Sequence, residues 1–307
     1  NQSTQPVVSA NNVFKKLIYG KDHILSTPVI GTKESVASIT LNDVKNFYAS
    51  KFSPSVSELV VVGDVSKEQV LSSLGFLKTW PAKEVVKAVQ PANPVIDKTR
   101  IYFVNKDNAP QSEVRVGFLA IPYDATGEYF KTTLANYILG GAFNSRINLN
   151  LREDKGWTYG ARSNFAGTKF AGPFVANAGI KGDATDSSVV EFMKEIKNYA
   201  DAGITDNELA FMKSSIGQQD ALKYETAMQK AGFIKRILDY NLPKDFVAQQ
   251  QAIIKNITKE ELNAVVKKNL PYNNMVIVVM GNRAKHFDKL KALGYDVIDL
   301  DTDGNQL

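Results

Sequence analysis

The sequence predicts an α+β fold made of two homologous domains in tandem, each a largely antiparallel sheet covered on one face by helices. Three observations support this fold class. A pattern of helix, proline and strand occurs twice along the chain. In the C-terminal part, strand patterns come first and helix patterns follow. A last strand pattern returns at Met275–Met280, which brings the helices together in one layer beside the sheet.

The repeat has the same features in the same order. A threonine opens a helix, an acidic residue stands three positions later, a proline follows, and a hydrophobic strand stops at a glycine 23 residues after the threonine. A period of this size indicates a repeated domain and not a solenoid. The shared positions are Thr40, Asp43, Pro54 and Gly63 in the first copy and Thr258, Glu261, Pro271 and Gly281 in the second.

The first copy lacks its beginning. The strand pattern Arg100–Asn105 opens the second unit about 180 residues before Gly281, whereas 62 residues precede Gly63. We therefore expect the first domain to be truncated by roughly 120 residues. A proline-rich stretch without hydrophobic period separates the copies. The predicted divisions are 1–79 for the C-terminal part of the first domain, 80–99 for an interdomain linker and 100–307 for the second domain.

Each element is predicted from the period of its apolar residues, since spacings of three and four indicate helices and alternation indicates strands. A capping box at Thr205–Glu208 opens one helix, Gly203 ends the helix before it, and Pro243 starts another. The predicted helices are Val36–Ser50, Lys67–Leu74 and Asp186–Ala202, and the predicted strands are Glu58–Val62, Arg100–Asn105, Val114–Phe118 and Phe174–Ile180.

Composition excludes several functions. With 44% hydrophobic and 22% charged residues over 307 positions, the chain is globular and long enough to bury a core. The net charge of +5 is spread out without a basic run, so we expect no nucleic-acid partner. The absence of cysteine excludes disulfides, thiol catalysis and cysteine-ligated zinc.

Residues 139–165 are the segment richest in chemistry. Gly140 and Gly141 predict a flexible or close-approach loop, followed by a helix at Phe143–Lys155 and a strand at Trp157–Phe165. Arg152 ends this helix and Tyr159 begins the strand, so both side chains can face one space. An arginine fork binds carbonyls or carboxylates, and a tyrosine hydroxyl donates to an oxyanion. The same spacing also permits a structural role, with Arg152 paired to a carboxylate and Tyr159 packed on the sheet.

Other candidates are weaker. His23 and His286 belong to neither HxxEH nor HExxH, and we expect both to be surface or loop residues. The adjacent carboxylates Glu153 and Asp154 do not share a helix face and form a poor acid/base pair. Ser145 has no neighbouring histidine in the sequence to activate it.

The run from Gly140 to Tyr159 resembles the second-domain signature of the pitrilysin/insulinase family of metallopeptidases. Residues Tyr19–Thr40 and Leu59–Val65 resemble the end of that family's first domain. The resemblance implies two halves that close like a clamshell around a peptide, which adds as a strand to a sheet edge. It gives Arg152 the role of contacting the substrate backbone and Tyr159 that of steadying the scissile carbonyl, with Gly140 and Gly141 in the substrate-binding set.

One feature departs from the family. Its zinc is held by HxxEH and a later glutamate, and no HxxEH occurs in this chain. We therefore expect no metal ligands here, with zinc either in a missing part of the chain or in a partner half. The partners expected are that zinc-bearing half and a peptide, in a homo- or heterodimer. A non-enzymatic scaffold subunit is the alternative function. Composition leads us to expect the bacterial periplasm or cell envelope.

Overall fold

The computed structural model describes residues 5–87, 89–218 and 224–307. Contacts within the chain divide it into two compact units. The larger unit comprises residues 1–27, 91–217 and 246–307, and the smaller unit comprises residues 28–90 and 218–245. No helix among the described residues is long and apolar enough to cross a membrane.

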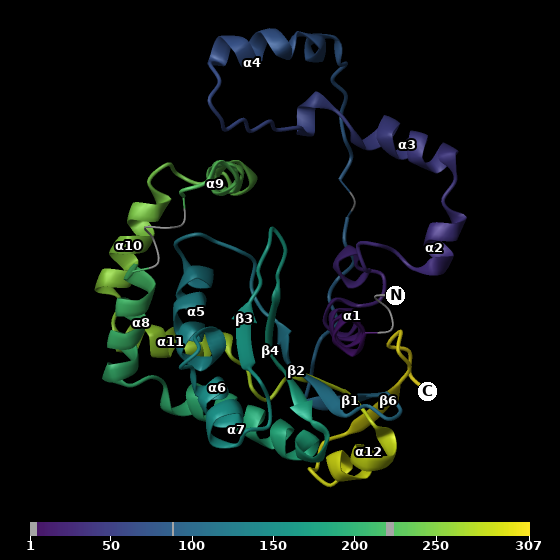
Figure 1. Ribbon diagram of the computed structural model, residues 1–307, viewed down its shortest axis with the longest axis vertical. Helices are drawn as coiled ribbons and strands as arrows, with labels where there is room; N and C mark the ends of the chain where they lie inside the picture. Colours follow the sequence, from purple (N-terminus) through teal and green to yellow (C-terminus); the bar gives the residue numbers. More distant parts are fainter. Residues whose placement is uncertain (1–4, 88, 219–223) are drawn as a thin grey trace. The chain divides into compact units, whose positions relative to one another are not determined.

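The larger unit is built on a six-stranded sheet in the order β3-β4-β2-β5-β1-β6 (Figure 1). The pairs β3–β4, β4–β2 and β2–β5 are antiparallel, whereas β1 lies parallel to both β5 and β6. This mixed, mainly antiparallel sheet confirms the α+β prediction. The strands are β1 (Arg100–Asn105), β2 (Gln111–Leu119), β3 (Ala161–Phe165), β4 (Pro173–Lys181), β5 (Val276–Gly281) and β6 (Val297–Leu300).

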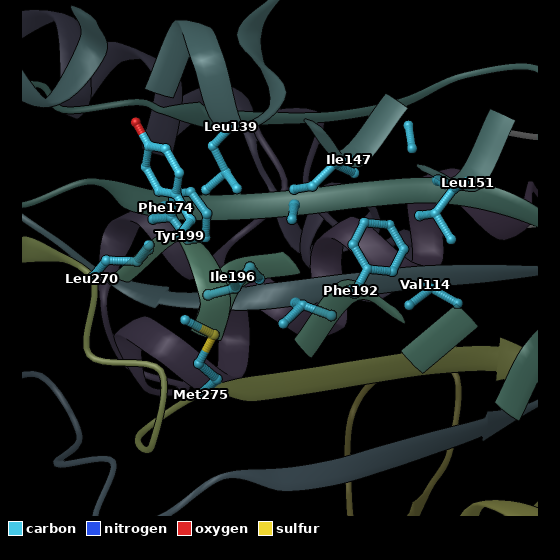
Figure 2. Packing of buried hydrophobic residues seen from close by; sticks show 14 of the residues in the cluster. Val114, Leu139, Ile147, Leu151, Phe174, Phe192, Ile196, Tyr199, Leu270 and Met275 are labelled. Atoms are coloured by element: carbon cyan, nitrogen blue, oxygen red, sulfur yellow. The ribbon is translucent and has the colours of Figure 1, made fainter. Parts of the chain in front are cut away.

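Helices from the C-terminal part of the chain cover one face of this sheet. Phe192, Ile196 and Tyr199 lie on one stripe of α7 and are fully buried in the main core, where Figure 2 shows them beside side chains of the sheet. The helices are α5 (Glu128–Asn136), α7 (Thr185–Ala202), α8 (Asp206–Gln218), α10 (Phe246–Asn256), α11 (Lys259–Asn269) and α12 (Arg283–Lys291). Helix α10 begins three residues later than its predicted start at Pro243.

The opposite face of the sheet is covered by α1 (Pro6–Tyr19), which the sequence assigned to the first domain. Figure 1 shows α1 on the side of the sheet away from α5 and α7. Phe14 packs over Gly117 of β2, where a Cβ would collide with its ring. The buried Arg115 pairs with Glu113 at 3.0 Å and donates through Nε to Asn11 of α1 at 2.8 Å. The sheet is therefore covered on both faces, although the sequence predicted one.

The two copies of the repeat form the same helix but not the same strand. Thr40 caps α3 (Leu41–Lys51) and Thr258 caps α11, each through a reciprocal bond with the acidic residue three positions later. Strand β5 forms in the second copy, whereas residues 58–62 form no strand in the first. The prediction of a strand at Glu58–Val62 was wrong because a strand needs a hydrogen-bonded neighbour, and none of the described residues supplies one.

The smaller unit contains short capped helices. Among its described residues, no large hydrophobic side chain is buried. The predicted helix at Lys67–Leu74 is confirmed as α4, and the predicted linker has no helix or strand in its described residues. The helices of this unit are α2 (Lys33–Ser38), α3, α4 (Lys67–Ser73) and α9 (Ala227–Tyr240).

Candidate functional site

The candidate site lies on the segment between α5 and β3, which contains two π-helical turns. These are η5 (Tyr137–Gly141) and η6 (Leu149–Asp154), with the short α6 (Arg146–Asn148) between them. The sequence predicted one continuous helix at Phe143–Lys155, and this was wrong. Ala142 N–H donates to Tyr137 O and Lys155 N–H to Asn150 O, so both turns close five residues back. Such turns often occur at functional sites.

Gly140 allows η5 to pass directly against β3. A Cβ at this position would lie well inside contact distance of Ser163, both at its hydroxyl and at its backbone nitrogen. Gly140 is buried, whereas Gly141 is exposed and has room for a methyl group with a small adjustment. The predicted close approach is therefore made by Gly140, and it is an approach to the sheet.

Gly156 reverses the chain between Arg152 and Tyr159. Its φ of +60° is a left-handed conformation that glycine adopts easily. Across the reversal, Gly156 N–H donates to Arg152 O at 3.1 Å and Trp157 N–H donates to Leu151 O at 3.0 Å. These bonds hold residues 151–152 beside 156–157. Regular pairing of β3 begins at Ala161, four residues after the predicted start of the strand.

Arg152 and Tyr159 both remain available at the surface. The Arg152 guanidinium lies over the Phe143 ring, 4.5 Å from its centroid, and its Nη1 is 3.5 Å from Glu153 Oε1. A pair between two such half-exposed neighbours contributes little to stability. Tyr159 is 91% exposed and therefore does not pack against the sheet. The sequence left open a structural role in which Arg152 pairs with a carboxylate and Tyr159 packs on the sheet. Arg152 does form a weak pair with Glu153, but Tyr159 does not pack on the sheet.

Arg146 has a structural role that sequence reasoning missed. Its guanidinium binds both carboxylate oxygens of Glu208, at 2.6 and 2.7 Å, and donates to Gly203 O at 2.9 Å. It also stacks over the buried ring of Tyr199 at 4.9 Å. Burial acts to raise the pKa of Glu208, but hydrogen bonds from Arg146 and Thr205 outweigh it and hold this pKa below its ordinary value. Glu208 thus joins the predicted capping box to the candidate segment.

The outer edge of β3 is already occupied by side chains. Ala161 N–H donates to Asn148 Oδ1 at 3.0 Å, Asn136 Nδ2 donates to Ser163 O at 2.7 Å, and Tyr129 donates to Phe165 O at 2.9 Å. A peptide cannot add to β3 as a further strand unless it displaces these groups.

The histidines do not fit a zinc site. We expected surface or loop histidines, and His23 does lie in a loop, although it is only 3% exposed. The expectation was wrong for His286, which lies within α12 and is 2% exposed. His23 stacks on Tyr19 at 4.9 Å and its Nδ1 accepts a bond from Leu25 N–H, which explains its burial in a loop. No group of three His, Asp or Glu side chains placed to hold a metal occurs in the described ranges. The residues present therefore do not match the family's zinc ligands.

The sheet with helices on both faces and the segment from Gly140 to Tyr159 define a processing-peptidase-like α+β domain. The family profile described as "Peptidase M16 inactive domain" matches residues 38–216. The chain belongs to this family, and the resemblance to pitrilysin/insulinase metallopeptidases is confirmed.

Two curated relatives have names that differ on peptidase activity. A Helicobacter pylori protein named non-peptidase homolog YmxG is 26% identical over 271 residues, which cover 85% of this chain and 60% of that protein. A Bacillus subtilis protein named uncharacterized zinc protease YmxG is 23% identical over 220 residues, which cover 72% of this chain and 52% of that protein. The chain therefore spans less than two thirds of the length of either relative.

Solved structures have the same fold. The peptidase M16 inactive domain from Pseudomonas fluorescens has a TM-score of 0.81 at 24% identity and covers 92% of this chain and 66% of that one. The periplasmic protease PqqL from Escherichia coli has a TM-score of 0.70 at 16% identity and covers 91% of this chain and 31% of that one. At these identities the likeness establishes the fold alone.

Proposed function

We propose that this chain supplies the substrate-contacting half of a zinc endopeptidase that acts on peptides in a clamshell site. Arg152 would donate to backbone carbonyls of the peptide, and the Tyr159 hydroxyl would donate to the scissile carbonyl oxygen as it becomes negatively charged. The observation that carries this proposal is the surface position of both side chains on a segment held by buried contacts. Zinc would come from another part of the protein or from a partner half.

A non-enzymatic scaffold is the second candidate function. The name of the Helicobacter pylori relative, non-peptidase homolog, favours it. A scaffold does not need an exposed arginine and tyrosine for chemistry, so substitution of either would leave its complexes unchanged. A loss of peptide binding on substitution of Arg152 or Tyr159 would therefore distinguish the two functions.

The proposal includes a location and an assembly. The bacterial periplasm or cell envelope is the proposed compartment, and a solved neighbour of this fold is titled a periplasmic protease. The proposed assembly pairs this half with a zinc-bearing half, in the same chain or in a separate subunit.

Binding of an unfolded protein tests the proposal. Fluorescein-labelled β-casein is titrated with the full chain and followed by fluorescence anisotropy. The change Arg152→Ala should weaken binding about tenfold or more, because it removes a charged hydrogen-bond donor. The change Tyr159→Ala should also weaken binding, and the two changes combined should weaken it more than either alone. Arg236→Ala on α9 and Tyr48→Phe on α3 are controls on elements that do not belong to the candidate segment. Wild-type affinity in both Arg152→Ala and Tyr159→Ala would refute the proposal.

A further inference from the structure

Asn148 occupies a central place in the candidate segment. It is the last residue of α6, directly before η6, and only 3% of it is exposed. Its Nδ2 donates to Phe143 O at 2.7 Å, and its Oδ1 accepts from Ala161 N–H at 3.0 Å. One carboxamide thus connects the loop before α6 to the first residue of β3.

These two bonds end at residues close to both candidate side chains. Phe143 carries the ring over which the Arg152 guanidinium lies, and Ala161 follows Tyr159 by two residues. We propose that Asn148 is a positioning residue, which sets Arg152 and Tyr159 at a fixed separation so that both engage one peptide. This inference rests on the proposed function and adds a residue that acts through the other two.

Tyr159 depends on its backbone for its position, because its ring is 91% exposed. Before it, Trp157 is held on both sides, with its N–H donating to Leu151 O at 3.0 Å and its oxygen accepting from Lys181 N–H at 2.9 Å. After it, the pairing of β3 with β4 begins at Ala161, and Asn148 accepts from the Ala161 N–H on the outer edge. Loss of the Asn148 bond would remove this outer-edge contact and loosen the C-terminal side of the Tyr159 turn, while the N-terminal side stays in place.

Arg152 depends on the Phe143 ring in a similar way. Phe143 is 52% exposed, so its ring is fixed by few neighbours, and the bond from Asn148 to its carbonyl oxygen holds its backbone. The Nδ2 donor and the Oδ1 acceptor of Asn148 are both needed to make the two bonds. An aspartate at position 148 would keep an acceptor for Ala161 N–H but would turn a carboxylate oxygen toward Phe143 O, whereas an alanine would lose both bonds.

Asn136 provides a matched control within the same fold. It is also buried, at 6% exposed, and it also bonds β3, through Ser163 O at 2.7 Å and the Ser163 hydroxyl at 2.6 Å. Neither of these bonds reaches Phe143 or Ala161. An effect that comes only from loosening β3 would therefore appear in Asn136→Ala as well as in Asn148→Ala.

The test is a double-mutant cycle on β-casein binding, with amide exchange at Ala161 as a second readout. We expect Asn148→Ala to weaken binding about five- to tenfold, Asn148→Asp to weaken it less, and both to add nothing in an Arg152→Ala/Tyr159→Ala background. Exchange at Ala161 should speed up in Asn148→Ala and stay slow in Asn148→Asp. Asn136→Ala should lower thermal stability with little change in affinity.

The remaining outcomes distinguish failure of the positioning role from failure of the proposed function. Wild-type affinity in Asn148→Ala, together with weak binding by the Arg152→Ala/Tyr159→Ala protein, would overturn the role of Asn148 and leave the proposed function standing. An equal loss of affinity from Asn148→Ala in both backgrounds would reduce Asn148 to a structural residue. Wild-type affinity in the Arg152→Ala/Tyr159→Ala protein would overturn the proposed function and, with it, the positioning role.

Discussion

Arg146 and Arg152 lie six residues apart on one segment, yet their side chains have different surroundings. Arg146 is mostly buried and forms a two-bond pair with Glu208, whereas the described residues give the Arg152 guanidinium a neighbouring carboxylate and an exposed ring. A planar guanidinium with several bonds to fixed partners is part of the fold. One with donors left over at the surface is available to a ligand. This contrast gives Arg146 a structural role and is the reason for the binding role that we propose for Arg152.

The first prediction concerns Arg146. The change Arg146→Ala removes charged hydrogen bonds and leaves Glu208 partly buried, so we expect it to lower the free energy of unfolding by about 2–3 kcal/mol. Arg152→Ala is the control and should cost less than about 0.5 kcal/mol. Because the pKa of Glu208 is lowered in the fold, the contribution of the pair is present at neutral pH and is lost as the pH falls below 4.5, the ordinary pKa of the group. Urea unfolding at two pH values measures both effects.

The second prediction concerns His286, whose two ring nitrogens have no hydrogen-bond partner among the described residues. Burial and the nearby Lys289 and Lys285 lower its pKa, against the opposing effect of Asp186 and Asp183. The folded protein therefore favours the neutral ring, so this contribution to stability is full above pH 6.5 and declines as the pH falls below it.

The variant His286→Phe should flatten this decline. Melting temperatures measured between about pH 5 and 7 cover the window in which an unperturbed histidine titrates. Carboxylates titrate mostly below this window and are common to both proteins. A slope in His286→Phe equal to that of the wild type would show that another group causes it.

At the scale of elements, local signals predicted most strands and helices to within a few residues, and they failed at particular places. The predicted helix Val36–Ser50 is divided between α2 and α3, because Thr40 caps a new helix. The capping boxes at Thr40 and Thr258 depend on bonds across three residues, so they form with or without a core beneath them. Residues 58–62 read as a strand because of their composition, but a ladder depends on a neighbour that sequence pattern cannot supply. The two π-turns were missed because their apolar spacing resembles that of an α-helix.

Reliance on local signals also explains which residues of the candidate site the sequence identified. Arg152 and Tyr159 stand out by residue type and mutual spacing. Asn148 and Arg146 bind partners 13 and 62 residues away, which no local pattern indicates.

The third prediction concerns the contact between η5 and β3. Gly140→Ala places a methyl group against the backbone of Ser163, so we expect the free energy of unfolding to fall by about 1–3 kcal/mol. Gly232 lies in the exposed part of α9 with no neighbour near its would-be Cβ, and Gly232→Ala should instead be neutral or stabilise by up to about 1 kcal/mol. Thermal melts of the two variants measure the difference. Equal melting temperatures would mean that η5 moves away from β3 at little cost.

At the scale of the whole molecule, sequence order and spatial order differ. Helix α1 comes from the N-terminal end of the chain but completes the second face of the sheet formed by residues 100–300. Lys16 of α1 donates to Asp303 O at 2.7 Å, and Tyr19 donates to Ala171 O at 3.0 Å, so the helix is tied to two distant parts of the larger unit. The repeat gave no information about this contact, because it aligns segments without showing which ones touch.

The fourth prediction tests the role of α1. Phe14 is 4% exposed, and Phe14→Ala should lower the free energy of unfolding of the larger unit by about 3–5 kcal/mol. Val7→Ala, on the same helix at 43% exposure, should change it by less than about 0.5 kcal/mol. Urea unfolding followed by far-UV circular dichroism compares the two. Similar midpoints would mean that α1 covers the sheet without contributing to its stability.

The π-turns also have an evolutionary consequence. A π-turn has one residue more than an α-helical turn, so η6 is equivalent to a helix with a single insertion. Removal of that residue would preserve a helix but rotate the side chains beyond it by about 100°. Arg152 would then leave Phe143 while the sheet and core remained intact. In this fold, the loss of one codon would therefore suffice to move Arg152 away from Phe143 without disturbing the core.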